Sequence, residues 1–511
     1  MINISFIHQY IISIIPFVII LMVLTSVLKA KLKSYDFGII LFFLWALTLN
    51  ILFFFDYFQV NRVVTLSIFA MSLALFFIIN LSNKEKRTYL IKNISFRELV
   101  ILFGFWLIGL IILNIPLAIA YPQTTLITGT QVSDDSVAHA NWARGFEFTG
   151  DSRYLFSRTF DSNAPRAFHS FIHFSNVLNK ETYELLLPNI IFGYSLIIFA
   201  TFSILKSELT KGKLRYIVLL VGVTPFLVIN SIYVMFLNQI VVIPLLIATV
   251  YFILGLNLSK LKVLDIVIPT VLSVALFNTY SILPVSIVAF AILIKMIDFF
   301  ITSVNKKNSI SNIVSFIKNL KLKKTNLNLY LILIITALTL IPGLFATKNL
   351  LTLEGETGTL SSSVGNLPGG FLDALHITGL WVPNASYRDY LSGPLSFIGG
   401  ILLVYFAFQI LIITKVSNTR RLLLVNLVFF APIVGTLLLL RNPYINFKYL
   451  TFFIPIFLIT FFICLFKVSQ QINIKNDYRW LKLEYIAAGF ALLVYLISIF
   501  VPLASYKKFV P

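Results

Sequence analysis

The sequence is poor in charge and has almost no cysteine. Of its 511 residues only 12% are charged, against the ~25% that is typical of soluble domains, while 59% are hydrophobic. A single cysteine, Cys464, excludes an intramolecular disulfide framework and a cysteine-rich metal site. No Gly-rich phosphate loop with Lys-Ser or Lys-Thr is present, which argues against an ATP-driven cycle. These shortages exclude a soluble enzyme, a nucleic-acid-binding protein and a disordered chain.

Long apolar runs, by contrast, recur along the whole chain. Each is roughly 20 residues long, which is enough to cross a ~30 Å hydrocarbon core. We therefore predict an all-α fold, a polytopic transmembrane helical bundle with about 14 spans. The predicted spans lie near residues 7–28, 35–55, 63–82, 98–120, 184–205, 215–235, 237–258, 263–280, 282–303, 327–346, 395–414, 421–440, 447–466 and 484–505.

The positions of the basic residues predict the orientation. No Lys or Arg precedes the first apolar run, so the positive region of a cleavable signal peptide is missing, whereas Lys29, Lys31 and Lys33 follow this run. By the positive-inside rule, the N-terminus is outside and the first loop is cytoplasmic. On this topology 28 of the 40 basic residues but eight of the 20 acidic residues are cytoplasmic, so the whole net charge of +20 lies on that face. The charge is thus an orientation signal and does not indicate an anionic partner such as nucleic acid.

The topology divides the chain into five parts. Spans occupy 1–120, 184–346 and 395–511, and two long external loops occupy 121–183 and 347–394. Loops of this length are usually functional or disordered, and the many aromatic residues of the first loop argue against disorder. The weakest span predictions are the turn near Phe236 and the segment 263–303, which we interpret as a hairpin, with a re-entrant segment as the alternative. The first external loop is the candidate active site.

An acidic pair opens this first loop. Asp134 and Asp135 precede an expected helix, on which Asp135 and His139 share a face at four-residue spacing. A carboxylate held ionised beside a bound substrate can take a proton from a hydroxyl group, so both acids are candidate catalytic residues. The alternative is that they only cap a helix next to the membrane.

Basic and aromatic residues follow in the same loop. His169 and His173 have the i, i+4 spacing of a metal pair, but Ser170 replaces the glutamate of a metallopeptidase motif, so packed interfacial histidines are the favoured interpretation. Arginine side chains bind phosphate in a bidentate manner, and headgroup anchoring is the alternative. The candidate substrate-binding residues of the loop are His139, Arg144, Arg158, Arg166 and His169.

Two further external segments carry candidate functions. Residues 367–381 are typical of a short amphipathic helix that either walls a substrate groove or lies on lipid. The turn 441–449 carries Arg441 and Lys448, which are candidates to hold a lipid-linked phosphate. The alternative for this turn is an aromatic belt with snorkelling cations.

Together these features resemble the GT-C superfamily of polytopic glycosyltransferases. The resemblance rests on the acidic pair Asp134-Asp135 before a helix, the stretch Pro165 to His169, a late second external loop, and the turn 441–449 followed by Pro455. It implies a polyprenyl-phosphate-linked sugar as donor, a glycan or lipid as acceptor, an acid of the first loop at the reaction centre, and Arg166, Arg441 and Lys448 on the donor phosphate. Without an Asp-x-Asp in the loop no metal ligand is assigned, and a divalent metal stays open as a cofactor.

Two other functions remain open. A polymerase or ligase of lipid-linked polysaccharides also has many spans and arginine-bearing external loops. A transporter or lipid-glycan flippase is less favoured, because the span interiors hold almost no charge and no internal repeat is visible. Many Ile, Asn and Lys residues in short loops are typical of bacteria, and we expect a multi-pass protein of a bacterial cell membrane in contact with membrane lipids.

Overall fold

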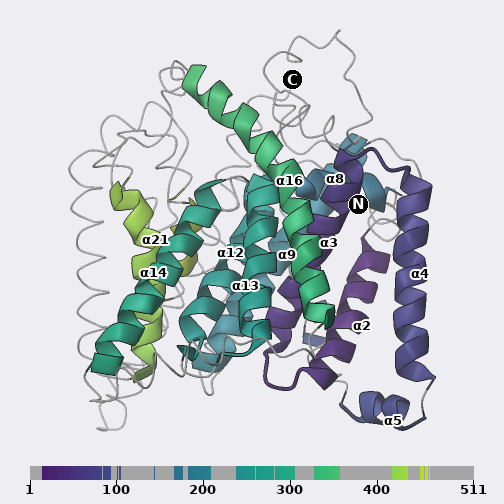
Figure 1. Ribbon diagram of the computed structural model, residues 1–511, viewed down its shortest axis with the longest axis horizontal. Helices are drawn as coiled ribbons and strands as arrows, with labels where there is room; N and C mark the ends of the chain where they lie inside the picture. The colour runs from purple at the N-terminus through teal and green to yellow at the C-terminus, as the bar shows by residue number, and fades with distance from the viewer. Residues whose placement is uncertain are drawn as a thin grey trace, which may run out of the picture.

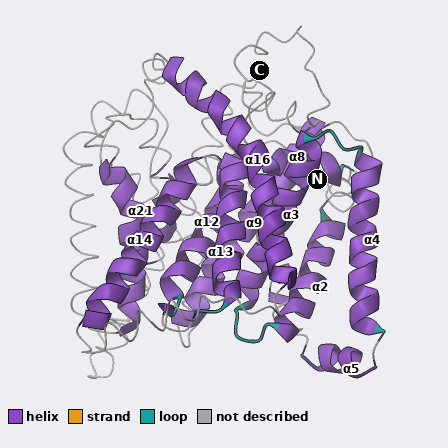
Figure 2. Ribbon diagram, viewed as in Figure 1, coloured by secondary structure: helices purple, strands orange, loops and turns teal. Residues whose placement is uncertain are grey.

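The structure is a computed structural model in which the described residues are helical, with short connecting turns (Figure 2). It describes residues 14–82, 84–93, 166–176, 182–208, 237–258, 261–280, 282–304, 327–356 and 417–435, with single positions at 100–107, 143 and 449–460. No strand occurs within these ranges. The helices are α2 (Ile15–Lys31), α3 (Phe37–Tyr57), α4 (Arg62–Leu81), α5 (Lys84–Asn93), α8 (Ala167–Ser175), α9 (Thr182–Glu208), α12 (Leu237–Gly255), α13 (Val263–Tyr280), α14 (Ile282–Val304), α16 (Leu327–Glu356) and α21 (Ser417–Gly435).

Five of the described helices, α3, α4, α12, α13 and α14, are long and apolar enough to cross a membrane. Together they are compatible with a multi-pass membrane protein. The segment 263–303, predicted as a hairpin, consists of two helices that pack against each other: α13 ends at Tyr280 and α14 begins at Ile282. Pro284 lies in the first turn of α14, where proline is tolerated because the N–H groups there have no partner in the helix.

Helices α3, α12 and α13 form the centre of the bundle, and α2, α8, α9, α14, α16 and α21 pack around them (Figure 1). The contrast in burial is large: 89% of the apolar stretch of α12 is buried, but only 6% of that of α4. Helix α4 contacts α2 through Phe76 and Phe77, which pack on Val27 and Ala30. The exposed apolar side chains of α4 suit contact with lipid better than contact with water.

The centre of the bundle contains a buried amide network. The Asn278 Nδ2 group donates to Asn50 Oδ1 at 3.0 Å and to the carbonyl oxygen of Thr339 at 3.0 Å. The Asn50 Nδ2 group donates to the carbonyl oxygen of Val271 at 3.1 Å. Gly343 makes this packing possible, because a Cβ atom at this position would fall on the amide oxygen of Asn278. The network joins α3, α13 and α16.

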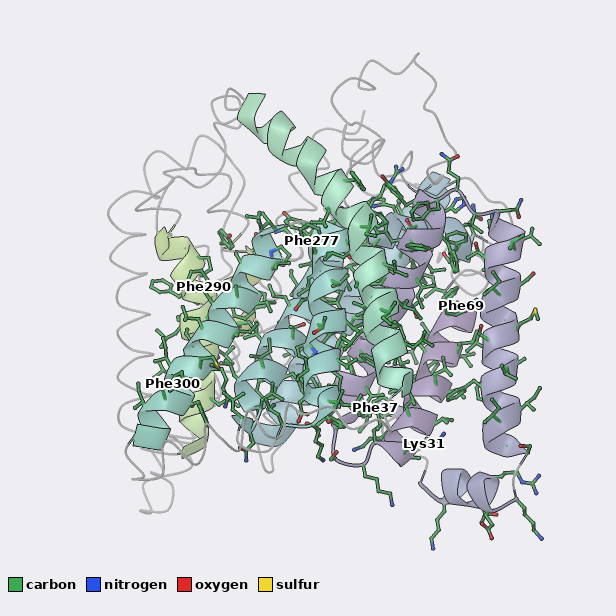
Figure 3. All side chains as sticks on the ribbon, in the orientation of Figure 1. Lys31, Phe37, Phe69, Phe277, Phe290 and Phe300 are labelled. Carbon is green, nitrogen blue, oxygen red and sulfur yellow. The ribbon has the colours of Figure 1, made fainter. Side chains whose placement is uncertain are left out.

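The described basic residues at the end of α2 and on α5 lie at one end of the bundle, which we call the basic end (Figure 1). The Tyr35 hydroxyl, between α2 and α3, donates to Asp265 Oδ1 at the start of α13 at 2.9 Å. Lys295 Nζ donates to the carbonyl oxygen of Leu254 at 3.0 Å, and Arg421 Nη2 donates to that of Tyr251, so both cations stabilise the C-terminal end of α12. Lys31, Phe37 and Phe300 lie at this lower end in Figure 3, whereas Phe277 lies near the other.

Two elements differ from the sequence predictions. Residues 84–93, predicted as part of a loop, form the polar helix α5. Helix α16, predicted to end near 346, continues to Glu356, because Leu350, Leu351 and Leu353 favour helix and neither glycine nor proline occurs from Leu344 to Glu354. The first ten residues of the predicted second external loop are therefore helical.

Candidate functional site

Helix α8 lies at the end of the bundle opposite the basic end (Figure 1). It begins where the Ser170 amide donates to the Arg166 carbonyl at 3.0 Å, and it ends where the Asn176 amide donates to the Ile172 carbonyl at 3.1 Å. Eight of its nine residues are buried, all except His173. A helix that is buried on every side is part of the core and does not rest on a membrane surface.

Aromatic packing holds α8 against its neighbours. The ring of Phe171 lies 4.7 Å from that of Trp45 on α3 and 4.8 Å from that of Phe17 on α2, centroid to centroid, and both contacts are edge-to-face. Phe168 stacks on Phe171 at 5.7 Å and meets Trp45 at 6.2 Å. Such pairs add ~1 kcal/mol each beyond the burial of area, so α8 has a fixed position on α2 and α3.

A buried carboxylate meets α8 at the last turn of α3. The Ser170 hydroxyl donates to Asp56 Oδ2 at 2.5 Å, a length typical of an O–H group that donates to a charged oxygen. Asp56 is 3% exposed and Ser170 is fully buried. Because an isolated buried carboxylate is very costly, we expect this position to need compensating charge as well as hydrogen bonds.

Arg166 supplies that charge. Its side chain is also 3% exposed, and burial lowers the pKa of the guanidinium to about 10, while the negative charge of Asp56 acts in the opposite direction and raises it. The guanidinium is therefore charged at neutral pH. Arg166 and Asp56 are both buried, and the carboxylate is close enough for its charge to act on the guanidinium. We call Asp56, Arg166 and Ser170 the Asp56 cluster.

The two histidines of α8 are packed against neighbouring groups. His169 is fully buried, and the His173 ring meets that of Phe174 edge-to-face at 5.0 Å. Within the part of the chain that the structure describes, no group of three His, Cys, Asp or Glu side chains is placed to hold a metal ion.

Part of the basic turn 441–449 also lies at this end. The hydroxyls of Tyr449 and Ser286, in the first turn of α14, are 2.8 Å apart, and Phe452 meets Tyr280 edge-to-face at 5.6 Å. Helix α8 also packs against α13, whose last residue is Tyr280. Residues from distant parts of the sequence therefore meet at the opposite end.

The structure describes two of the nine predicted site residues: Arg166, which directly precedes α8, and His169, which lies in the first turn of that helix. The other seven lie outside the described residues: Asp134, Asp135, His139, Arg144, Arg158, Arg441 and Lys448. The expected helix 367–381 also lies outside them.

Sequence reasoning missed Asp56 and the role of Ser170. The sequence does mark Asp56 as unusual, because this acid directly follows Phe53, Phe54 and Phe55 at the end of an apolar run. An ionisable residue within or at the end of a span is a candidate functional residue, because placing a charge in the membrane costs free energy.

The Asp56 cluster fixes the point at which the first long loop enters the bundle. The chain that carries Asp134 and Asp135 reaches α8 at Arg166, whose charge lies at the positive N-terminal end of that helix. A cation and a helix N-terminus together favour a nearby anion. Comparison of the chain with protein-family models, curated proteins and solved structures gives no match.

Proposed function

We propose that the protein is an integral membrane glycosyltransferase of the GT-C type, which moves a sugar from a polyprenyl-phosphate donor to a cell-envelope glycan or lipid acceptor. In this proposal the chain has about 14 spans, the end opposite the basic end is the outer face, and the N-terminus is outside. The segments 121–183 and 347–394 then face the outside of a bacterial cell membrane, where the donor phosphate and the acceptor would meet.

The observation that supports this proposal best is the burial of α8 beside the Asp56 cluster. A loop that only connected two spans would need no buried charge pair. Here Arg166 and Asp56 are both 3% exposed, and breaking such a pair is costly. The cluster holds the end of the first long loop rigidly, as a site on that loop requires, because reacting groups must be positioned closely.

The proposed reaction is an inverting transfer. The oxygen of the acceptor hydroxyl attacks the anomeric carbon, the bond from this carbon to the phosphate oxygen breaks, and the phosphate leaves with the bonding electrons. The proton of the hydroxyl passes to Asp134 or Asp135. The leaving phosphate gains negative charge, which Arg166, Arg441 and Lys448 would stabilise.

The test is sugar transfer from a labelled polyprenyl-phosphate donor in membranes that contain the wild-type chain, Asp134→Asn or Asp135→Asn. We expect at least one variant to lose activity by about 100-fold or more, because a general base contributes this much. Asp151→Asn, an acid of the same loop outside the pair, is the matched control and should keep its activity. If Asp134→Asn and Asp135→Asn both kept full activity, neither acid could be the general base.

The product of the same assay separates the transferase from a polymerase or ligase. A single added sugar supports the transferase, whereas a lengthened glycan supports the polymerase or ligase. If the wild-type chain transfers no sugar from any polyprenyl-phosphate donor, the proposed function itself is wrong.

The amide network favours transport as a second candidate function. Asn50 and Asn278 place polar groups inside the apolar centre, and Pro269 and Pro342 lie inside α13 and α16. Polar residues and prolines within spans are common in transporters. Proteoliposomes that move a labelled lipid-linked glycan across the bilayer without changing it would favour transport. The network contains amides and no charge, and for this reason the transferase is preferred.

A further inference from the structure

Helix α5 lies across the basic end of the bundle, between the lower ends of α2 and α4 (Figure 1). Helix α4 ends at Leu81 and α5 begins at Lys84, so the chain changes direction within a short turn. Helix α5 packs against both α2 and α4. A polar helix that directly follows an apolar span is expected in water beside the membrane boundary.

Exposed cations surround this turn. Lys84, Arg87 and Lys92 of α5 are exposed, and so are two further lysines near the end of α2, Lys31 and Lys33. We call these five residues the basic platform. The exposed acids of the same segments are Glu85 and Asp36, so positive charge is in excess by three. Lys31, the last residue of α2, is the lowest of the labelled residues in Figure 3 and lies on the side of α5.

The surface next to these cations is apolar. In the last turn of α4, Ile78 is 63% exposed, Ile79 is 54% exposed and Leu81 is 42% exposed. A soluble anion would match the cations only, and a neutral lipid would match the apolar side chains only. A molecule with an anionic headgroup and acyl chains matches both.

We propose that the basic platform binds the headgroups of anionic phospholipids, with their acyl chains along the last turn of α4. Such a lipid fastens α4 to α2 beside the contact of Phe76 and Phe77 with Val27 and Ala30. It adds contacts to the span with the least protein packing. The proposal does not depend on the proposed glycosyltransferase function.

The test uses the full chain in nanodiscs of phosphatidylcholine alone and of an equal mixture of phosphatidylcholine and phosphatidylglycerol. The readouts are the Tm in each lipid and the number of phosphatidylglycerol molecules retained in native mass spectrometry. We expect phosphatidylglycerol to raise the Tm of the wild-type chain. The triple variant Lys84→Gln/Arg87→Gln/Lys92→Gln should lose about half of this rise or more and retain fewer lipids, because three of the five cations are removed.

Glu85→Gln is the matched control, because it changes the same helix in the opposite electrical direction. It should keep or enlarge the rise in Tm. An equal rise in the triple variant and the wild-type chain would overturn the proposal, even if the triple variant were less stable in both lipids. The proposal would also fail if inorganic phosphate, added to phosphatidylcholine nanodiscs, reproduced the rise, because a free anion would then explain it.

Discussion

Helix α5 and the Asp56 cluster lie at opposite ends of the bundle, and their charged side chains differ in exposure. At the basic end, Lys84, Arg87 and Lys92 are exposed. At the opposite end, Arg166 and Asp56 are buried together at the start of α8 and the last turn of α3. An exposed charge is solvated and contributes little to the fold, whereas a buried one constrains the elements that carry it. Removal of a charged side chain should therefore lower stability more at the Asp56 cluster than on α5.

The largest expected effect comes from breaking the Asp56 cluster. Arg166→Ala leaves a carboxylate buried without its cation, which should lower the free energy of unfolding by about 3–5 kcal/mol. The measurement is reversible unfolding in detergent. Lys92→Ala, the matched removal of a cation at the basic end, should change this free energy by less than about 0.5 kcal/mol.

A double-mutant cycle sharpens the same comparison. Asp56→Ala/Arg166→Ala removes both charges, so its loss should be smaller than the sum of the losses of the two single variants. If the losses in free energy of unfolding were additive, the two side chains would not interact, and the burial of each would need another cause.

A smaller loss of stability is expected when an added methyl group crowds the amide network. Gly343→Ala places a Cβ atom on the amide oxygen of Asn278 and close to the ring of Phe277, and should cost about 1–3 kcal/mol as overpacking does. Gly104→Ala is the control, because no atom of the described residues lies within 4 Å of the place that its Cβ atom would take. Comparable stability of the two variants would show that α16 moves away from α13 at little cost.

The smallest of these effects concerns the contact between loops at the basic end. Tyr35→Phe removes the hydrogen bond to Asp265 and should cost about 1 kcal/mol at neutral pH. Burial, and then the hydrogen bond and charge of Asp265, raise the pKa of Tyr35 above its ordinary value. The stabilisation is therefore fully present below pH ~10, the unfolded pKa, and is lost only as the pH rises beyond it. The measurement is the free energy of unfolding of the wild-type chain and of Tyr35→Phe at pH 7 and above pH 10. The difference between the two proteins should be smaller at the higher pH.

The positions of the described apolar helices were largely predictable from the sequence, because hydropathy is a property of consecutive residues. Helix α13 begins and ends where the sequence predicted it, and α3 and α4 differ from their predicted ranges by at most two residues at each end. The hairpin of 263–303 followed from its length and from the basic residues on both sides. The candidate site was less predictable: Arg166 was named for its type, but its partner Asp56 was not.

The sequence alone thus determined which segments are apolar helices and which of their ends carry the basic residues, since both depend on local composition. The tertiary structure decided which polar groups meet inside the bundle. Ser170 and Asp56 are 114 residues apart, and Asn278 and Asn50 are 228 apart. Such pairs depend on which helix faces pack together, and no local pattern in the sequence encodes this choice. The burial of α8 also depends on which helices pack around it, because its sequence alone is equally compatible with a position on a membrane surface.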